Sequence, residues 1–215
     1  MPLIPPGRYQ HILWDWNGTL LDDAALCVEI MDQLLRRYGK PGLTPERYQR
    51  IFDFPVRDYY QALGFDFSRT PFEQVGTEFM MEYYRRWRTC QIRQHAQTVL
   101  RRFQQQRIPQ SILSAASVTL VQQGLEHFGL DSFFADIHGL DHHYAEGKLA
   151  QAQAFLSHCT SAPETVLLIG DTTHDHRVAS AVGMDCVLIP AGHHALERLQ
   201  ACGVPLCTTL RDLIA

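Results

Sequence analysis

Strand-like apolar runs that alternate with helical patterns restrict the fold of this chain more than any other feature of its sequence. One such run opens the chain, and helical segments separate the others from residue 95 onward; the runs lie at residues 9–15, 108–113, 133–138, 165–169 and 185–189. Strands alternating with helices are typical of a parallel sheet with helices on both faces. We therefore expect an α/β protein whose core is a doubly wound, Rossmann-like parallel sheet.

Residues 21–94 break this alternation, because their apolar positions follow a helical period. Four helices are expected there, and the residues that can begin them are Asp22 or Asp23, Thr44 with Pro45, Pro55, and Pro71. A helical stretch without a strand signal, placed after the first strand of the sheet, predicts an insertion. We expect a core of residues 1–20 and 95–215 and a smaller α-helical cap domain of residues 21–94.

Polar side chains stand at the ends of three of the apolar runs. Asp15 ends the first run, Ser114 follows the run at 108–113, and Asp171 follows the run at 165–169 after one glycine. In a doubly wound sheet, ligands bind beyond the carboxyl ends of the strands. We therefore expect these three side chains, although far apart in sequence, to share one pocket.

The chain carries these residues in a fixed order, with one lysine between the last two. The order is Asp15-Trp16-Asn17-Gly18-Thr19, then Ser114, then Lys148, then the acidic pair of Gly170-Asp171-Thr172-Thr173-His174-Asp175. This set, with a helical insertion after its first member, resembles the haloacid dehalogenase-like hydrolase superfamily and, within it, the phosphoglycolate phosphatase-like branch with a helical cap. Most members of that superfamily are Mg²⁺-dependent phosphatases. The resemblance implies hydrolysis of a small phosphorylated metabolite with Mg²⁺ as cofactor.

The resemblance also implies a role for each residue of the set. Asp15 would be the nucleophile that forms an aspartyl-phosphate, while the Ser114 hydroxyl and the Lys148 ammonium would bind the phosphate. The catalytic candidates are therefore Asp15, Asn17, Ser114 and Lys148. Further phosphate contacts are expected from backbone N–H groups near Asp15 and Ser114 and from one side chain of the cap; these residues are Trp16, Gly18, Thr19, Ala115 and Arg57.

A Mg²⁺ site is the second implication of the resemblance. Mg²⁺ prefers carboxylate, carbonyl and water oxygens. The expected ligands are Asp15, Asp171 and the backbone carbonyl of Asn17, and Asp175 would complete or orient the site.

Asn17 departs from the family's pattern. In the phosphatases that the chain resembles, the residue two positions after the nucleophile is an aspartate, which protonates the leaving oxygen and then activates the hydrolytic water. An amide has no proton to exchange near neutral pH. Because general acid–base catalysis contributes roughly 10²–10⁴-fold to a rate, Asn17 predicts slow turnover with phosphate binding retained.

Two other functions stay open at this point. Phosphonoacetaldehyde hydrolases carry a motif similar to Asp15-Trp16-Asn17-Gly18-Thr19 and use a cap lysine as a Schiff base, and the only lysine in the cap here is Lys40. Alternatively, the chain binds a phosphorylated ligand with impaired turnover because of Asn17. Dehalogenation ranks lower, because that chemistry does not need an acidic metal-binding pair.

Composition excludes several classes of partner. The formal net charge is -4, which offers no basic face for nucleic acid, and no apolar run is long enough to span a membrane. The N-terminal residues lack the pattern of a signal peptide, and the six cysteines are scattered without paired spacing. We expect a cytoplasmic protein that is a monomer or a weak homodimer.

The chain contains 11 histidines, two pairs of which are adjacent. Neighbouring histidines in an extended segment point to opposite sides and make a poor chelate. We interpret the pairs His142-His143 and His193-His194 as surface residues. His174 lies within the acidic motif, so we expect it near the pocket.

Overall fold

The computed structural model describes residues 3–5, 7–141, 145 and 147–214. Its centre is a five-stranded parallel sheet in the order β5-β4-β1-β6-β7. The strands are β1 (His11–Trp14), β4 (Gln110–Ser117), β5 (Ile137–Leu140), β6 (Val166–Gly170) and β7 (Asp185–Leu188). The α/β, doubly wound fold predicted from the alternation is confirmed.

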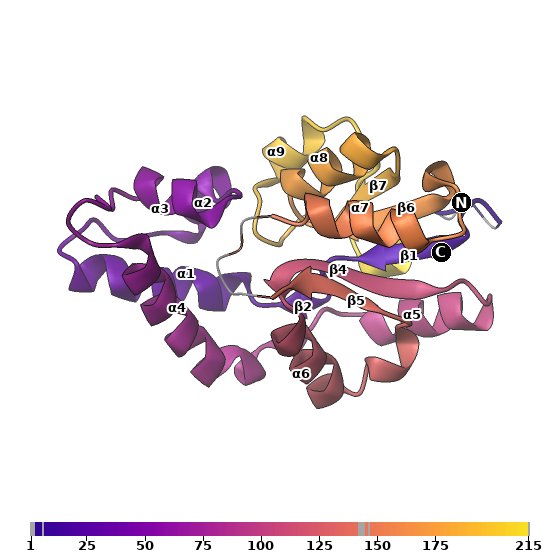
Figure 1. Cartoon of the computed structure of the whole chain (residues 1–215), viewed down its shortest axis with the longest axis horizontal. Helices are drawn as coiled ribbons and strands as arrows, with labels where there is room; N and C mark the ends of the chain where they lie inside the picture. Colours follow the sequence, from indigo (N-terminus) through magenta and orange to yellow (C-terminus); the bar gives the residue numbers. More distant parts are fainter. Residues whose placement is uncertain (1–2, 6, 142–144, 146, 215) are drawn as a thin grey trace.

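Helices cover both faces of this sheet (Figure 1). On one face lie α5 (Ala96–Gln105) and α6 (Val118–Phe128), and on the other lie α7 (Leu149–His158), α8 (Thr173–Val182) and α9 (Leu196–Gln200). Short 3-10 turns occupy Trp87–Thr89, Asp131–Phe133, Pro163–Thr165 and Leu210–Leu213. Successive side chains of β1 belong to two different hydrophobic clusters. Ile12 and Trp14 belong to one cluster, and Leu13 belongs to the other. Burial on both faces explains why the strand runs are apolar throughout.

Four helices between β1 and α5 extend away from the sheet in Figure 1. They are α1 (Ala24–Arg37), α2 (Pro45–Ile51), α3 (Val56–Ala62) and α4 (Phe72–Arg86), so the predicted helices of the cap are confirmed. An antiparallel pair of two-residue strands, β2 (Leu21–Asp22) and β3 (Gln91–Ile92), joins the start and the end of this segment. Such short strands carry no periodic signal, and the domain boundaries at residues 20/21 and 94/95 stay a prediction.

Two strands differ in extent from the prediction. β4 continues to Ser117, so Ser114 lies within the strand, where the pairing with β5 shifts register between Leu113 and Ser117. The small residues that follow Leu113 gave no apolar signal for this extension. β5 begins only at Ile137, because the preceding residues include the 3-10 turn at Asp131–Phe133.

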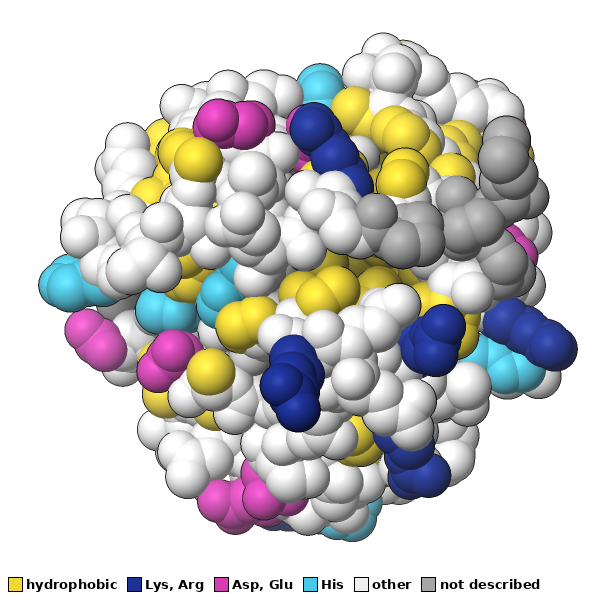
Figure 2. Space-filling view, turned by 90° about the vertical axis from the view of Figure 1, so that its right-hand side faces the viewer, with side chains coloured by type: hydrophobic (Ala, Val, Ile, Leu, Met, Phe, Trp, Pro, Cys, Tyr) yellow, Lys and Arg dark blue, Asp and Glu magenta, His cyan; other side chains and the backbone are white. Residues whose placement is uncertain are grey.

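The end of the molecule that carries both chain termini lies away from α1–α4 (Figure 1). Figure 2 views this end, where basic and acidic side chains are dispersed among uncharged ones. Among the residues that the structure describes, no helix combines the length and the apolar character needed to cross a membrane.

Candidate active site

Three carboxylates meet at the carboxyl ends of β1 and β6. Asp15 follows β1, Asp171 follows β6, and Asp175 lies in the first turn of α8. All three are buried, and each offers an oxygen that lies within 4.8 Å of the other two. The structure thus brings together the acidic residues that the sequence placed at strand ends.

Lys148 is the cation at the centre of this cluster. Its Nζ lies 2.5 Å from Asp15 Oδ1 and 2.5 Å from Asp175 Oδ1, and it also donates to the Leu113 carbonyl at 3.0 Å. Only 2% of the residue is exposed. Burial opposes the charged ammonium, but the two carboxylates outweigh it and raise the pKa of Lys148, which therefore stays protonated.

Burial is the largest influence on the pKa values of Asp15 and Asp171, and the neighbouring carboxylates add to it. Burial, reinforced by the Asp175 and Asp171 carboxylates, raises the pKa of Asp15 against the opposing effect of Lys148. Burial and Asp175 likewise raise the pKa of Asp171. Buried hard oxygens with an excess of negative charge fit a Mg²⁺ ion. Asp15 and Asp171 would hold such an ion, while Asp175 is bonded to Lys148 and, by a capping box, to Thr172.

Backbone and hydroxyl donors fix the orientation of Asp171. The Thr19 hydroxyl lies 3.0 Å from Asp171 Oδ1 and 3.2 Å from Asp15 Oδ2, and the His193 amide donates to Asp171 Oδ2 at 2.6 Å. A Cβ on Gly18 or on Gly192 would lie only 2.3 or 2.1 Å from that same Oδ2. Glycine is therefore required at both positions by the close approach of the carboxylate.

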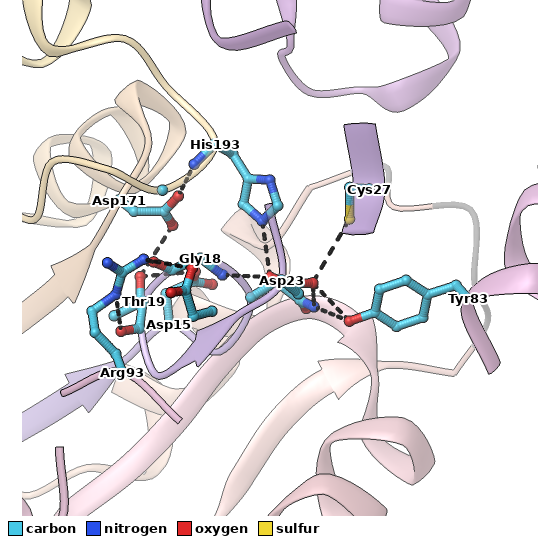
Figure 3. Close-up of polar contacts among 12 residues, drawn as sticks. Asp15, Gly18, Thr19, Asp23, Cys27, Tyr83, Arg93, Asp171 and His193 are labelled. Atoms are coloured by element: carbon cyan, nitrogen blue, oxygen red, sulfur yellow. Dashed lines mark hydrogen bonds and ion pairs between the residues drawn. The ribbon is translucent and has the colours of Figure 1, made fainter. Parts of the chain in front are cut away.

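Asn17 is held by a buried carboxylate that the sequence had presented as a helix cap. Its Nδ2 donates to Asp23 Oδ2 at 2.7 Å and to the Tyr83 hydroxyl at 2.8 Å. The Gly18 amide donates to Asp23 Oδ1 at 2.9 Å (Figure 3). The Tyr83 hydroxyl in turn donates to Asp23 Oδ2 at 2.7 Å. Asp23 occupies the N-cap position of α1, as one of the two predicted starting residues, but its side chain makes no capping hydrogen bond to the helix.

His193 forms an ion pair with Asp23, in contrast to the predicted surface position. Its Nε2 lies 3.3 Å from Asp23 Oδ1, and its Nδ1 lies 2.7 Å from the Tyr48 hydroxyl. Burial disfavours the charged ring, but Asp23 outweighs burial and raises the pKa of His193 to about 9. Despite burial, His193 also lowers the pKa of Asp23. The site therefore holds a second buried ion pair next to Asn17.

The adjacent histidines His193 and His194 are both buried, with exposed fractions of 5% and 0%, so their interpretation as surface residues is wrong. The other pair, His142-His143, lies outside the described residues. A signal for His193 existed in the sequence, because it follows the strand-like run at 185–189 just as Asp171 follows its own strand.

His174 lies behind Lys148, and it does not line the cavity. Its Nε2 accepts the backbone N–H of Lys148 at 3.2 Å, and its ring packs 4.8 Å from the ring of Phe54. Burial, together with the charge of Lys148, lowers the pKa of His174 to about 4. The ring is therefore neutral near pH 7 and has no proton to offer to a leaving group.

The predicted phosphate-binding residues separate into two groups. Ser114 and Ala115 line a cavity in front of Asp15, as expected for phosphate contacts. Trp16 is buried with its ring against α6, and the Thr19 hydroxyl is bonded to the carboxylates, so neither side chain reaches the cavity. The expected contacts through the backbone N–H groups of these two residues stay a prediction. The amide of Gly18 is already bonded to Asp23 and to the carbonyl of Leu21. A phosphate contact through that amide would require it to give up these partners, and the contact stays a prediction.

Neither cationic candidate of the cap reaches the cavity. The Arg57 guanidinium is half exposed, lies 3.6 Å from a Glu73 carboxylate oxygen, and does not line the cavity, which contradicts its predicted contact with the substrate. Lys40 donates to the Gly64 carbonyl and lies 5.0 Å from the centre of the Phe65 ring, also outside the cavity.

Arg93, which gave no sequence signal, fixes the loop after the nucleophile (Figure 3). Its guanidinium donates to the carbonyls of Gly18 and Thr19, the latter at 3.2 Å, and lies 3.8 Å from an Asp22 oxygen. Because Arg93 follows β3, it ties the end of the helical segment to the loop that carries Asn17.

Comparison with known proteins now identifies the family. The sequence profile of the haloacid dehalogenase-like hydrolases matches residues 12–189. The chain belongs to this family. The predicted family, that of the haloacid dehalogenase-like hydrolases, is therefore confirmed, and the fold agrees with solved structures.

A haloacid dehalogenase-like hydrolase from Streptococcus pneumoniae superposes with a TM-score of 0.82 at 18% identity, covering 96% of this chain and 97% of the other. A predicted phosphoglycolate phosphatase from Haemophilus somnus gives 0.81 at 14% identity, with 98% of each chain covered. Tyrosine-protein kinase PtkA of Mycobacterium tuberculosis is 23% identical over 186 residues, which cover 86% of this chain. The matched region is 63% of the length of that relative.

Replacement of Lys148 tests whether its ammonium holds the carboxylate cluster together. In Lys148→Met, the buried carboxylates lose their cation, and we expect a loss of about 3–5 kcal/mol in the free energy of unfolding. Mg²⁺ should raise the melting temperature of this variant more than that of the wild type, because the ion replaces the lost charge. Lys40→Met, which changes the only other lysine, is the control and should alter neither quantity by much. Similar behaviour of the two variants in denaturant and thermal unfolding would contradict this account.

Proposed function

We propose that the chain is a Mg²⁺-dependent phosphatase of a small phosphate monoester that acts through an aspartyl-phosphate on Asp15. The observation that carries the proposal is the position of Asp15, buried against Lys148 and near Asp171, with a cavity directly in front of it. A nucleophilic carboxylate, a fixed cation and hard oxygen ligands are the parts that phosphoryl transfer to a carboxylate requires.

In this proposal each side chain has one task. An Asp15 oxygen attacks phosphorus, while Lys148 and the Ser114 hydroxyl offset the charge on the phosphoryl oxygens. Mg²⁺, when held by Asp15 and Asp171 and by the carbonyl of Asn17, supplies Lewis-acid stabilisation of the same charge. A phosphatase transfers the phosphoryl group to water, and a kinase, the activity in the name of the mycobacterial relative, transfers it to another acceptor. A binding protein without turnover transfers it to nothing. Release of inorganic phosphate therefore separates the phosphatase from the other two.

Carbon–phosphorus cleavage loses its support in the structure. A Schiff-base lysine must reach the carbonyl of the substrate, yet Lys40 lies outside the cavity, on the Gly64 carbonyl and the Phe65 ring. Lys148 does line the cavity but is held as an ammonium by two carboxylates, and an amine must be neutral to form an imine.

Removal of the nucleophile tests the proposed function. We expect Asp15→Asn to lose at least about 10³-fold in the release of inorganic phosphate from phenyl phosphate, and EDTA to have a comparable effect on the wild type. Asp185→Asn changes an acid that contacts Arg8 and Tyr9 at the amino end of the sheet, and it should keep wild-type activity. Full activity of Asp15→Asn, or of the wild type in EDTA, would rule the proposal out.

A charge exchange tests the part that Asn17 plays in turnover. Asn17→Asp alone would place a carboxylate against Asp23, whose Oδ2 now accepts from Asn17 Nδ2 at 2.7 Å, and we expect it to be slow on every ester. The double variant Asn17→Asp/Asp23→Asn keeps one carboxylate and one amide but moves the acid next to the leaving group. We expect it to hydrolyse ethyl phosphate roughly 10²-fold faster than the wild type. A rate increase in Asn17→Asp alone, with none in the double variant, would show that Asp23 does not restrain this position.

A further inference from the structure

The cavity in front of Asp15 has a polar end and an aromatic end. Asp15, Ser114 and Lys148 line the polar end. Residues of the helical segment line most of the remainder, together with core residues that include Ser117, Leu120 and His193. Its volume is about 140 Å³. An apolar protein cavity of roughly 150 Å³ holds one benzene molecule. Because this volume must also hold the phosphoryl group next to Asp15, only a compact leaving group fits in the remainder of the cavity.

Aromatic side chains form most of the wall that faces away from the nucleophile; they include Tyr48, Phe52, Phe54, Tyr59, Phe79 and Tyr83. Their rings pack against one another, with 5.0 Å between the centroids of Tyr48 and Phe52 and 5.2 Å between those of Phe52 and Tyr59. Edge-to-face and offset contacts of this kind fix the shape of the wall. The wall thus offers an apolar, largely preformed surface to an aromatic ligand.

The described residues of this wall include no lysine or arginine for a second anionic group. Among the described residues, Lys148 is the only lysine or arginine that lines the cavity, and its donors are directed to Asp15, Asp175 and the Leu113 carbonyl. The other cation at the cavity, His193, is paired with Asp23. A carboxylate on the leaving group, such as that of phosphoglycolate, would be buried among aromatic rings without a partner, which is strongly unfavourable.

Of the tyrosine hydroxyls in the aromatic wall, those of Tyr48 and Tyr83 have hydrogen-bond partners, whereas that of Tyr59 has none in the part of the chain that the structure describes. The Tyr59 hydroxyl is buried and has no hydrogen-bond partner among the described residues. A buried hydroxyl usually has a partner. It can bond to a neutral polar substituent of a ligand, so the wall accepts a ring with a hydroxyl or carbonyl group as well as an unsubstituted ring.

We propose that the physiological substrate is the phosphate monoester of a compact, uncharged aromatic alcohol or phenol. The inference rests on the proposed phosphatase function and adds the chemical class of its leaving group. An Asp15 oxygen forms a bond to phosphorus as the bond from phosphorus to the ester oxygen breaks. That oxygen leaves with the electron pair and takes a proton from water, and a second water then hydrolyses the aspartyl-phosphate to inorganic phosphate. A phenolate oxygen needs little protonation as it leaves. Such a leaving group therefore suits a site in which Asn17, an amide, cannot act as the general acid.

Three alkyl esters with similarly basic leaving oxygens isolate the contribution of the cavity. We expect kcat/KM for benzyl phosphate to exceed that for ethyl phosphate by at least about tenfold, because the ring is removed from water. It should exceed that for 2-phosphoglycolate by at least about 100-fold, because the carboxylate of this ester finds no cation. Phenyl phosphate, whose leaving oxygen is less basic, should be hydrolysed faster than any of the three.

Two neighbouring methionines of α4 provide a matched pair of variants. Met80 lines the cavity, whereas Met81 is 61% exposed and does not line it. Met80→Arg should lower the preference for benzyl phosphate over 2-phosphoglycolate by at least about tenfold, because it adds a cation to the wall. Met81→Arg should leave this preference unchanged.

The outcomes separate this inference from the proposed function. Release of phosphate from all esters with equal efficiency, or a preference for 2-phosphoglycolate, would overturn the inference and leave the phosphatase intact. Release from none of them would overturn the phosphatase. In that case, calorimetric titration with benzylphosphonate and ethylphosphonate in Mg²⁺ still tests the cavity, because these analogues bind without turnover. We expect benzylphosphonate to bind at least about tenfold more tightly, and equal affinities would refute the inference.

Discussion

The ammonium of Lys148 is the interaction on which the rest of the site depends. A doubly wound sheet brings Asp15 and Asp171 to the same edge, and α8 adds Asp175, so three carboxylates are buried together. Such a cluster is stable only with compensating positive charge. A lysine suits this place because its compact ammonium donates to Asp15 and to the Leu113 carbonyl and at the same time forms an ion pair with Asp175.

A second ion pair, Asp23 with His193, lies on the opposite side of the nucleophile loop. Asp23 precedes α1, His193 follows β7, and Tyr83 on α4 completes the network around Asn17. The pair thus connects the helical segment to the core at the residue that departs from the family pattern. With a carboxylate already at Asp23, an amide at Asn17 avoids the repulsion that two neighbouring acids would create. The residues around Asn17 therefore favour an amide over the aspartate of the family pattern.

The sequence was sufficient to predict the sheet, the four inserted helices and the meeting of Asp15 with Asp171, because apolar runs and strand ends have local signatures. Lys148 has no such signature and was assigned to the site by the resemblance to the hydrolase family. It was not sufficient for Asp23 and His193, because the burial of a single polar residue depends on contacts between distant segments. The predicted contact of Arg57 with the substrate was wrong for a related reason. Helical periodicity predicts that a helix has a buried face, but it does not say whether Arg57 lies beside the cavity or on the outer surface.

Chemical trapping of the phosphorylated nucleophile tests the central claim most directly. An acyl phosphate is reduced by borohydride to an alcohol, so quenching the Mg²⁺-loaded protein with borohydride during turnover of phenyl phosphate should convert Asp15 to homoserine. Peptide mass spectrometry would locate the change. The account predicts substrate-dependent reduction at Asp15 and none at Asp171, Asp175 or Asp23. Turnover with Asp15 unmodified, or with the change at another carboxylate, would contradict it.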